Sequence, residues 1–195
     1  MSPKVSDLVQ GVVLAGGLST RMGRDKARIR LDGEFLYVRA ARCLIEAGCD
    51  RIVVVARSDL ETHPDISDFW RDLHGGQGPL DGLLTALTNS TAPMVSVLGV
   101  DLPGVTGEVL RRSREALAEN LDLDAVVLRG GQGRQALAAS WRRVPTLAAI
   151  QPLFASGERS IHRILEDLVV QDVIVGDEVL VNVNTPEELA ALRSE

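Results

Sequence analysis

The sequence is poor in the residues that would indicate disulfide bonds, thiolate metal centres or base stacking. Its two cysteines, Cys43 and Cys49, fit neither a CxxC redox motif nor a zinc knuckle. We expect two buried thiols in a reducing compartment. The chain holds only three Phe, two Trp and one Tyr. That supply is too sparse for the stacking platforms that bind single-stranded nucleic acid.

The chain also lacks a net basic charge: the formal net charge is −6 and the pI is about 5.1. A duplex-binding protein normally has a basic face. No apolar run reaches the ~18 residues of a membrane span, and residues 1–10 lack the features of a signal peptide. We therefore expect a cytoplasmic protein that binds neither nucleic acid nor membrane. Lysine is nearly missing, with Lys4 and Lys26 the two among 21 basic residues, so Lys26 stands out.

Short apolar runs alternate with segments of helical periodicity, and turn residues separate them. For 195 residues this pattern predicts one domain, 1–195, with an α/β fold: a three-layer αβα sandwich around a mostly parallel, Rossmann-like sheet. Strands are expected at Gly11–Ala15, Arg51–Ala56, Met94–Val100, Asp124–Leu128, Ala136–Ser140 and Val169–Val175, and another ends at Val181. Helices are expected at Phe35–Ala47, from the capping box of Ser58 and Glu61, at Leu80–Leu87, Gly107–Ala118, Pro145–Phe154 and Ser160–Leu168, and from the N-cap Thr185.

In such folds ligands bind at the carboxyl ends of the strands. A glycine-rich loop follows the first strand, where Gly16 and Gly17 let the backbone approach a ligand closely. Arg21 and Lys26 can then neutralise a polyphosphate and its pyrophosphate leaving group. The spacing matches neither the Walker loop nor the GxGxxG fingerprint. The alternative is a solvated surface turn.

A carboxylate, Asp101, follows the strand Met94–Val100. Mg²⁺ prefers one or two carboxylates together with substrate phosphates and water, and Asp101 fits that role. The alternative is an Asp that starts the turn before Leu102-Pro103. Asn184 is a neutral oxygen ligand or orients the second substrate, with an ordinary turn residue as its alternative. The three histidines show no metal-ligand spacing and are interpreted as structural or surface residues.

Four motifs carry a resemblance to a known family. They are Leu14-Ala-Gly-Gly with Arg21-Met-Gly and Asp25-Lys26, then Gly78-Pro79-Leu80 with Gly82, then Val100-Asp-Leu-Pro103, and lastly Val183-Asn-Thr-Pro-Glu-Glu-Leu189. In this order and spacing they resemble the molybdenum cofactor guanylyltransferases, the MobA-like branch of the nucleotidyltransferases. The resemblance covers most of the chain and implies the fold of the nucleotide-diphospho-sugar transferases.

The resemblance also implies roles for individual residues. Nucleotide-binding positions are Leu14, Ala15, Gly16, Gly17, Arg21, Lys26, Asp72, Gly78, Pro79, Leu80 and Asp101; of these, Arg21, Lys26 and Asp101 are implied to be catalytic and Asp101 to hold Mg²⁺. Acceptor-binding positions are Arg134, Arg159, Asn182 and Asn184. A solvated surface position is the alternative for Asp72, and surface salt bridges are the alternative for Arg134 and Arg159. The nucleotide-binding half is then about 1–105 and the acceptor-binding half about 106–195.

The implied reaction transfers GMP from GTP to the terminal phosphate of molybdopterin, with or without molybdenum, and releases pyrophosphate. Proteins that deliver molybdopterin or mature molybdoenzymes are the implied partners. The acceptor loop departs from the family, because Arg134-Gln135-Ala136 stands where many members have His-Pro. Two alternatives stay open: a cytidylyl- or sugar-phosphate nucleotidyltransferase, and a non-catalytic GTP-binding or partner-docking module.

Overall fold

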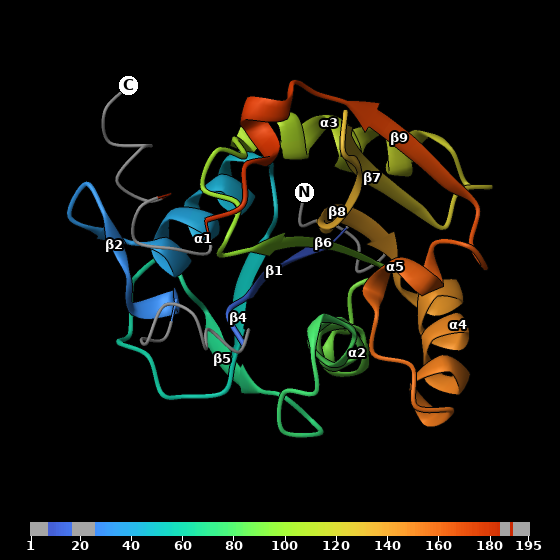
Figure 1. The fold of residues 1–195 in the computed structure, drawn as a ribbon, viewed down its shortest axis with the longest axis horizontal. Helices are drawn as coiled ribbons and strands as arrows, with labels where there is room; N and C mark the ends of the chain where they lie inside the picture. Colours follow the sequence, from blue (N-terminus) through green and yellow to red (C-terminus); the bar gives the residue numbers. More distant parts are fainter. Residues whose placement is uncertain (1–7, 17–25, 184–187, 189–195) are drawn as a thin grey trace.

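The computed structural model describes residues 8–16, 26–183 and 188 of the chain. Gly17, Arg21 and Asn184, which the sequence analysis singled out, lie outside the described residues, as does most of the helix expected from Thr185. The mixed α/β prediction is confirmed by a central sheet with helices on both faces (Figure 1).

The central sheet has seven strands in the order β5-β4-β1-β6-β8-β7-β9. Their bounds are β1 Val9–Leu14, β4 Arg51–Ala56, β5 Asp68–Arg71, β6 Met94–Gly99, β7 Ala125–Gly130, β8 Gly133–Arg142 and β9 Val170–Ile174. Four neighbouring pairs are parallel, while β8 runs antiparallel to both β6 and β7. The sheet is therefore mostly parallel, as the alternating pattern predicts, and β1, β4 and β6 end at the same edge.

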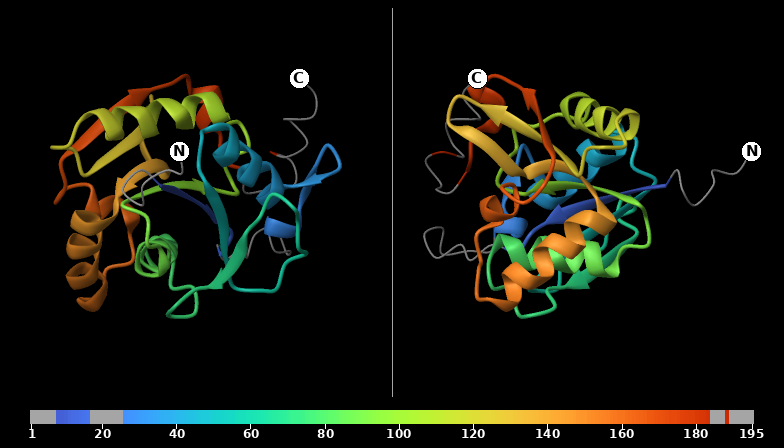
Figure 2. Two further views of the ribbon diagram at one scale, coloured as in Figure 1. Left: turned by 180° about the vertical axis from the view of Figure 1, so that it is seen from behind. Right: turned by 90° about the vertical axis from the view of Figure 1, so that its right-hand side faces the viewer.

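The helices form a layer on each face of this sheet (Figures 1 and 2). Helices α1 (Leu36–Glu46) and α3 (Gly107–Glu119) cover one face, and α2 (Pro79–Asn89), α4 (Arg143–Ala155) and the short α5 (Ile161–Ile164) cover the other. Strand β1 shows why both layers are needed: Val13 belongs to the apolar core under α1 and α3, and its neighbour Val12 belongs to the core under α2 and α4. A strand with both faces buried reads as a continuous apolar run.

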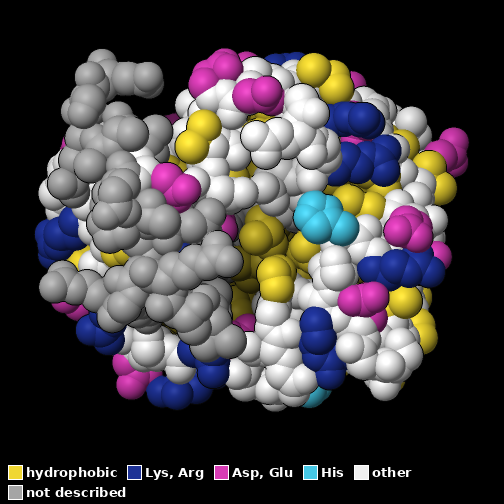
Figure 3. Space-filling model, in the orientation of Figure 1, with side chains coloured by type: hydrophobic (Ala, Val, Ile, Leu, Met, Phe, Trp, Pro, Cys, Tyr) yellow, Lys and Arg dark blue, Asp and Glu magenta, His cyan; other side chains and the backbone are white. Residues whose placement is uncertain are grey.

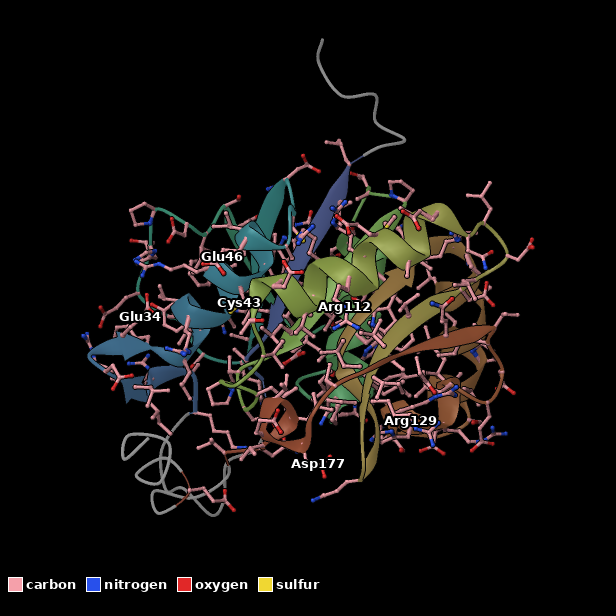
Figure 4. All side chains as sticks on the ribbon, turned by 90° about the horizontal axis from the view of Figure 1, so that it is seen from above. Glu34, Cys43, Glu46, Arg112, Arg129 and Asp177 are labelled. Atoms are coloured by element: carbon pink, nitrogen blue, oxygen red, sulfur yellow. The ribbon has the colours of Figure 1, made fainter. Side chains whose placement is uncertain are left out.

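The two cysteines belong to the α1 side of the molecule. Figure 4 shows Cys43 on α1, beside α3, and its Sγ donates to the carbonyl oxygen of Val105 at 3.3 Å. Burial raises the pKa of the Cys43 thiol to about 11 and that of Cys49 to about 12. Since the thiolate is the reactive form, both behave as packing residues, and neither forms a disulfide.

Local capping signals were predicted well at two helices. The side chain of Thr106 accepts a hydrogen bond from the backbone N–H of Val109 and so caps α3. Helix α1 ends before Gly48, which has a φ of +85° and thus the left-handed conformation that favours glycine after a helix.

Three element predictions were wrong. No helix follows Ser58, because Pro64 would lie inside it and lacks the N–H that a helix interior needs. The helix expected over Ser160–Leu168 is confined to Ile161–Ile164 and continues as tight turns. The segment that ends at Val181 is not a strand, since the 3₁₀-helix η3 (Asp177–Leu180) precedes it.

Two features were missed: the edge strand β5, and a small hairpin of β2 (Arg30–Leu31) and β3 (Glu34–Phe35) that turns at Asp32 and Gly33. A 3₁₀-helix, η2 (Lys26–Arg28), precedes this hairpin.

Within the described part of the chain, no helix is both long and apolar enough to span a membrane.

Candidate active site

A pocket opens at the carboxyl edge of β1, β4 and β6, against the start of α2. Its lining consists of Leu14, Gly16, Lys26, Val55, Asp72, Gly78, Pro79, Gly82, Val100, Asp101 and Leu137. Figure 3 shows a hollow in the middle of one face, with hydrophobic side chains at its floor. Nine of the predicted nucleotide-binding positions lie in the described residues, and seven of these nine line the pocket. Ala15 and Leu80 are buried and do not line the pocket.

Lys26 and Asp101 face each other in this pocket. Lys26 Nζ lies 3.8 Å from Asp101 Oδ2, and the two side chains are 13% and 23% exposed. Burial raises the pKa of the Asp101 carboxyl, and the charge of Lys26 lowers it again in part. The structure thus brings together the two residues on which the sequence-based interpretation depended. Chemically, the pair offers one cation and one anionic oxygen ligand at the mouth of an apolar hollow.

Asp101 is suited to hold Mg²⁺ together with a bound polyphosphate. The described residues contain no group of three or more His, Cys, Asp or Glu side chains that could hold a metal without a substrate. Mg²⁺ sites in phosphate-transferring enzymes commonly use one or two carboxylates and complete the shell with phosphate oxygens and water. A partly buried carboxylate beside a lysine fits that kind of site.

Asp72 lies on the opposite wall, where its carboxylate leans over Gly16. A Cβ added at Gly16 would lie 2.5 Å from Asp72 Oδ2, so a side chain at this position would displace the Asp72 carboxylate. Asp72 Oδ2 is buried and accepts no hydrogen bond from the described residues. Burial and the charge of Asp81 raise the pKa of Asp72, and Arg57 lowers it. An unsatisfied buried acceptor is costly, so this oxygen is placed to meet a ligand.

The loop before α2 forms the third wall and is fixed by a buried carboxylate. Asp81 Oδ2 accepts hydrogen bonds from the backbone N–H groups of Gly76 and Gln77, each at 3.0 Å, and Asp81 Oδ1 lies 2.9 Å from His74 Nδ1. Asp81 is fully buried in the first turn of α2, where a negative charge also suits the helix dipole. The loop therefore presents Gly78 and Pro79 to the pocket in a defined position.

A second, more polar pocket lies farther along the same edge, beside the turn between β7 and β8. Its lining consists of Gly130, Gln132, Gly133, Arg134, Gln135, His162, Asp177, Glu178, Leu180, Val181, Asn182 and Glu188. Two predicted acceptor residues, Arg134 and Asn182, meet here. Figure 4 shows Asp177 close to the end of the β7–β8 hairpin, where Asp177 Oδ1 accepts a hydrogen bond from the backbone N–H of Gly131 at 2.5 Å.

Arg134 is ion-paired as well as pocket-lining. Its Nε lies 2.7 Å from Asp172 Oδ1, and its side chain remains 33% exposed. The predicted surface salt bridge and the predicted pocket position are thus both present. Arg159, the third acceptor candidate among the described residues, lines neither pocket.

The two pockets are neighbours, because strand β8 and the segment around Asp101 connect them. Strand β8 contributes Gln135 to the second pocket and Leu137 to the first. The backbone N–H of Val183, next to Asn182, donates to the carbonyl oxygen of Asp101 at 2.8 Å. Asp101 therefore stands between the two cavities.

Sequence reasoning missed several lining residues. Leu137 and Val55 reach the first pocket as apolar strand residues, and no sequence signal distinguishes them from other core positions. His162 was interpreted as structural or surface, yet it lines the second pocket. Its sequence context, two residues after the Gly157-Glu158-Arg159-Ser160 segment, was the available hint.

Comparison with known proteins adds identity to this geometry. Residues 11–173 match the family model described as MobA-like NTP transferase domain. A probable molybdenum cofactor guanylyltransferase of Opitutus terrae is 37% identical over 88% of this chain and 84% of its own length. One from Synechococcus elongatus is 34% identical over 93% of this chain and 96% of its own length.

Solved structures share the fold. Molybdopterin-guanine dinucleotide biosynthesis protein A from Archaeoglobus fulgidus has a TM-score of 0.77 at 24% identity and covers 95% of this chain and 97% of its own. The 2-C-methyl-D-erythritol 4-phosphate cytidylyltransferase of Thermus thermophilus has a TM-score of 0.72 at 14% identity, with coverage of 94% and 96%. At these identities the likeness concerns the fold alone, and a cytidylyltransferase shares it. The sequence match decides the family: the chain belongs to the MobA-like NTP transferases.

Proposed function

We propose that this protein transfers GMP from GTP to the terminal phosphate of molybdopterin, with release of pyrophosphate. The observation that carries the proposal is the Lys26–Asp101 pair at the junction of an apolar pocket and a polar pocket. The curated relatives at 34–37% identity carry the name molybdenum cofactor guanylyltransferase, which supports the choice of substrates. The product is the guanine dinucleotide form of the cofactor.

In the proposed mechanism a phosphate oxygen of the acceptor attacks the α-phosphorus of GTP, and the bond to the bridging oxygen of pyrophosphate breaks. A phosphate is already a competent nucleophile, so alignment and charge stabilisation dominate and no general base is assigned. Lys26 donates hydrogen bonds to phosphate oxygens and offsets the charge that develops on pyrophosphate. Mg²⁺ bound to Asp101 would supply further neutralisation of the phosphate charge.

Asp72 supports guanine as the preferred base. Guanine presents two adjacent donors, N1–H and the 2-amino group, to one carboxylate, whereas the other three bases offer at most one donor on that part of their edge. Asp72 Oδ2 is buried without a partner in the described residues, against Gly16 and close to the start of α2. The base then lies among Leu14, Val55 and Pro79, and its triphosphate extends toward Lys26.

The second pocket supports the acceptor assignment. Arg134 offers a cation, Gln135 and Asn182 offer amides, and His162 offers an imidazole, beside the carboxylates of Asp177, Glu178 and Glu188. The cation suits the phosphate of molybdopterin, and the amides and carboxylates suit the donors and acceptors of its polar heterocycle. The lining of the first pocket comes from residues 14–101 except for Leu137, and that of the second comes from residues 130–188. This distribution supports a single domain, 1–195, with a nucleotide-binding half of about 1–105 and an acceptor-binding half of about 106–195.

The direct test combines the purified protein with Mg²⁺, molybdopterin and each of the four NTPs in turn, and measures pyrophosphate release. We expect release with GTP that depends on both Mg²⁺ and molybdopterin. Preferential release with CTP would identify a cytidylyltransferase instead. Tight Mg-GTP binding without release would favour a non-catalytic GTP-binding or partner-docking module. The cytoplasmic location and the partners that deliver molybdopterin or mature molybdoenzymes stay predictions from the sequence.

Replacing Asp72 by Asn is expected to weaken base selection. Loss of a charge-assisted hydrogen bond of about 1.5–3 kcal/mol lowers kcat/KM for GTP by ~10–100-fold. The rate with CTP is expected to change little, so the ratio of the two rates is the measurement. The exposed Asp59, whose carboxylate pairs with Arg71 at the surface, gives the matched control Asp59→Asn. An unchanged GTP-to-CTP ratio in Asp72→Asn would place base recognition elsewhere.

The same substitution is expected to stabilise the fold. The pKa of Asp72 is raised by burial and by Asp81, so ionisation of this carboxyl opposes folding. Its contribution to the free energy of unfolding is largest below the unfolded-state pKa and is lost as the pH rises through the folded-state pKa. Removing this charge is expected to increase the free energy of unfolding at pH 7. The gain, measured by denaturant titration, is expected to vanish in acid, where the wild-type carboxyl is protonated.

A further inference from the structure

We propose that Arg159 is a positioning residue for the nucleotide pocket, acting through Gln77, and that it does not contact the acceptor. The inference rests on the proposed function and concerns the wall of the site formed by residues 74–78. It assigns a role to a side chain outside both pockets, and it revises the acceptor-binding role that the family resemblance implies for this arginine.

The guanidinium of Arg159 is occupied by three kinds of contact within the protein. Its Nε donates to Gln77 Oε1 at 2.9 Å. Its Nη1 donates to the carbonyl oxygens of Phe154 and Glu158, at 2.9 and 2.6 Å. The guanidinium carbon also lies 4.1 Å from the centre of the Phe154 ring, within the range of a cation–π interaction. Three of the five guanidinium N–H donors are thus engaged within the protein, which leaves the two of Nη2.

The contact with Gln77 links Arg159 to the nucleotide pocket. The backbone N–H of Gln77 donates to the buried carboxylate of Asp81, and its side-chain amide donates to the carbonyl oxygen of His74 at 3.1 Å. Gln77 is followed by Gly78 and Pro79, which line the pocket. The backbone of Arg159 also lies against Gly78, since a Cβ added there would be 3.5 Å from the Arg159 carbonyl oxygen.

Phe154 anchors the same loop from a second direction. The ring of His74 lies 4.6 Å from that of Phe154, centre to centre, and His74 Nδ1 lies 2.9 Å from Asp81 Oδ1. Phe154, near the end of α4, therefore contacts both His74 and Arg159. Each of these two residues in turn contacts the loop that precedes α2. Residues 74–78 are held against the α4 end of the molecule, and Arg159 is the link that a single substitution can remove.

This arrangement predicts that Arg159 controls GTP affinity before any acceptor is present. In Arg159→Met the stem still packs on Phe154 while the donors are lost, so we expect the Kd for Mg-GTP, measured by calorimetry without acceptor, to rise about 5–10-fold. Arg159→Lys retains charge without the planar fork and is expected to restore only part of the affinity. Gln77→Ala removes the partner and is expected to reproduce the effect of Arg159→Met. The double variant is expected to bind GTP no more weakly than either single variant.

The control is Arg163→Met, because Arg163 pairs only with Glu166 and Asp167 among the described residues and is expected to bind GTP as the wild type does. Melting temperatures of all variants separate this effect from general unfolding. An unchanged Kd for GTP in Arg159→Met, with a raised KM for molybdopterin, would overturn the inference and assign Arg159 to the acceptor. Additive losses in the double variant would also overturn it. Failure of the wild type to bind GTP would instead refute the proposed function.

Discussion

Replacing Asp101 by Asn is expected to lower turnover by at least ~100-fold, the scale of losing one positioned electrostatic stabiliser. The substitution keeps the shape of the side chain but removes the negative charge that would hold Mg²⁺ beside the phosphates. The measurement is pyrophosphate release at saturating GTP and molybdopterin. Asp122→Asn is a matched control, since Asp122 is exposed and lines neither pocket.

The Asp101 variant is expected to remain folded, so that lost activity reports on chemistry. Burial raises the pKa of Asp101 in the folded protein, which means that ionisation of this group opposes folding as the pH rises through the folded-state pKa. Asp101→Asn is therefore expected to melt at or above the wild-type temperature at pH 7. Near-wild-type turnover in this folded variant would remove Asp101 from the mechanism.

The raised pKa also gives the expected direction of the pH profile. Protons compete with Mg²⁺ for this carboxylate, so at limiting Mg²⁺ wild-type turnover is expected to fall as the pH drops, and to begin falling at a higher pH than it would with an ordinary Asp. Lys26 opposes this shift through its positive charge. In a Lys26→Gln variant the fall in whatever turnover remains is therefore expected to begin at a higher pH than in the wild type.

The sequence predicted the central strands and the main helices because their signals are local. Apolar runs over Arg51–Ala56 and Met94–Gly99 and the caps at Thr106 and Gly48 each depend on a few neighbouring residues. The hairpin at Asp32-Gly33 was also encoded locally, since both residues have positive φ and Asp-Gly favours such turns.

The wrong or missing element predictions have two causes: local signals that compete with one another, and contacts between segments far apart in the sequence. Ser58 and Glu61 have the spacing of a capping box, but Pro64 forbids the helix that they would begin. Strand β5 is short and at the sheet edge, and only its pairing with β4 defines it. No periodicity reveals such a pairing, because β-structure depends on the partner strand more than on the segment itself.

In the site, too, local motifs were predictable and long-range contacts were not. Lys26 and Asp101 were predicted as a functional pair from their motifs, and the fold places them 3.8 Å apart although 75 residues separate them in the chain. Arg159 was predicted from a motif too, yet its partners Gln77 and Phe154 could not be foreseen. The motif located an important arginine, while only the tertiary contacts indicate which part of the site it serves.

Replacing Lys26 by Gln is expected to lower turnover by at least ~100-fold as well, through loss of the charge that offsets developing pyrophosphate. Lys26→Arg keeps a cation, but a planar fork replaces a compact ammonium, and we expect it to recover a minor part of the lost rate. Arg28→Gln is the nearby control, because Arg28 is exposed and donates to the carbonyl oxygen of Asp59 at the surface. Melting temperatures accompany each rate.

Combining Lys26→Gln with Asp101→Asn tests whether the two residues act on one transition state. Groups that act as a unit give losses far smaller than the product of the single losses. We therefore expect the double variant to lose only about as much turnover as the worse single variant. The free-energy effects of substitutions at contacting residues are often not additive. Fully multiplicative losses would mean that Lys26 and Asp101 stabilise separate steps, with Lys26 then assigned to GTP binding and Asp101 alone to transfer.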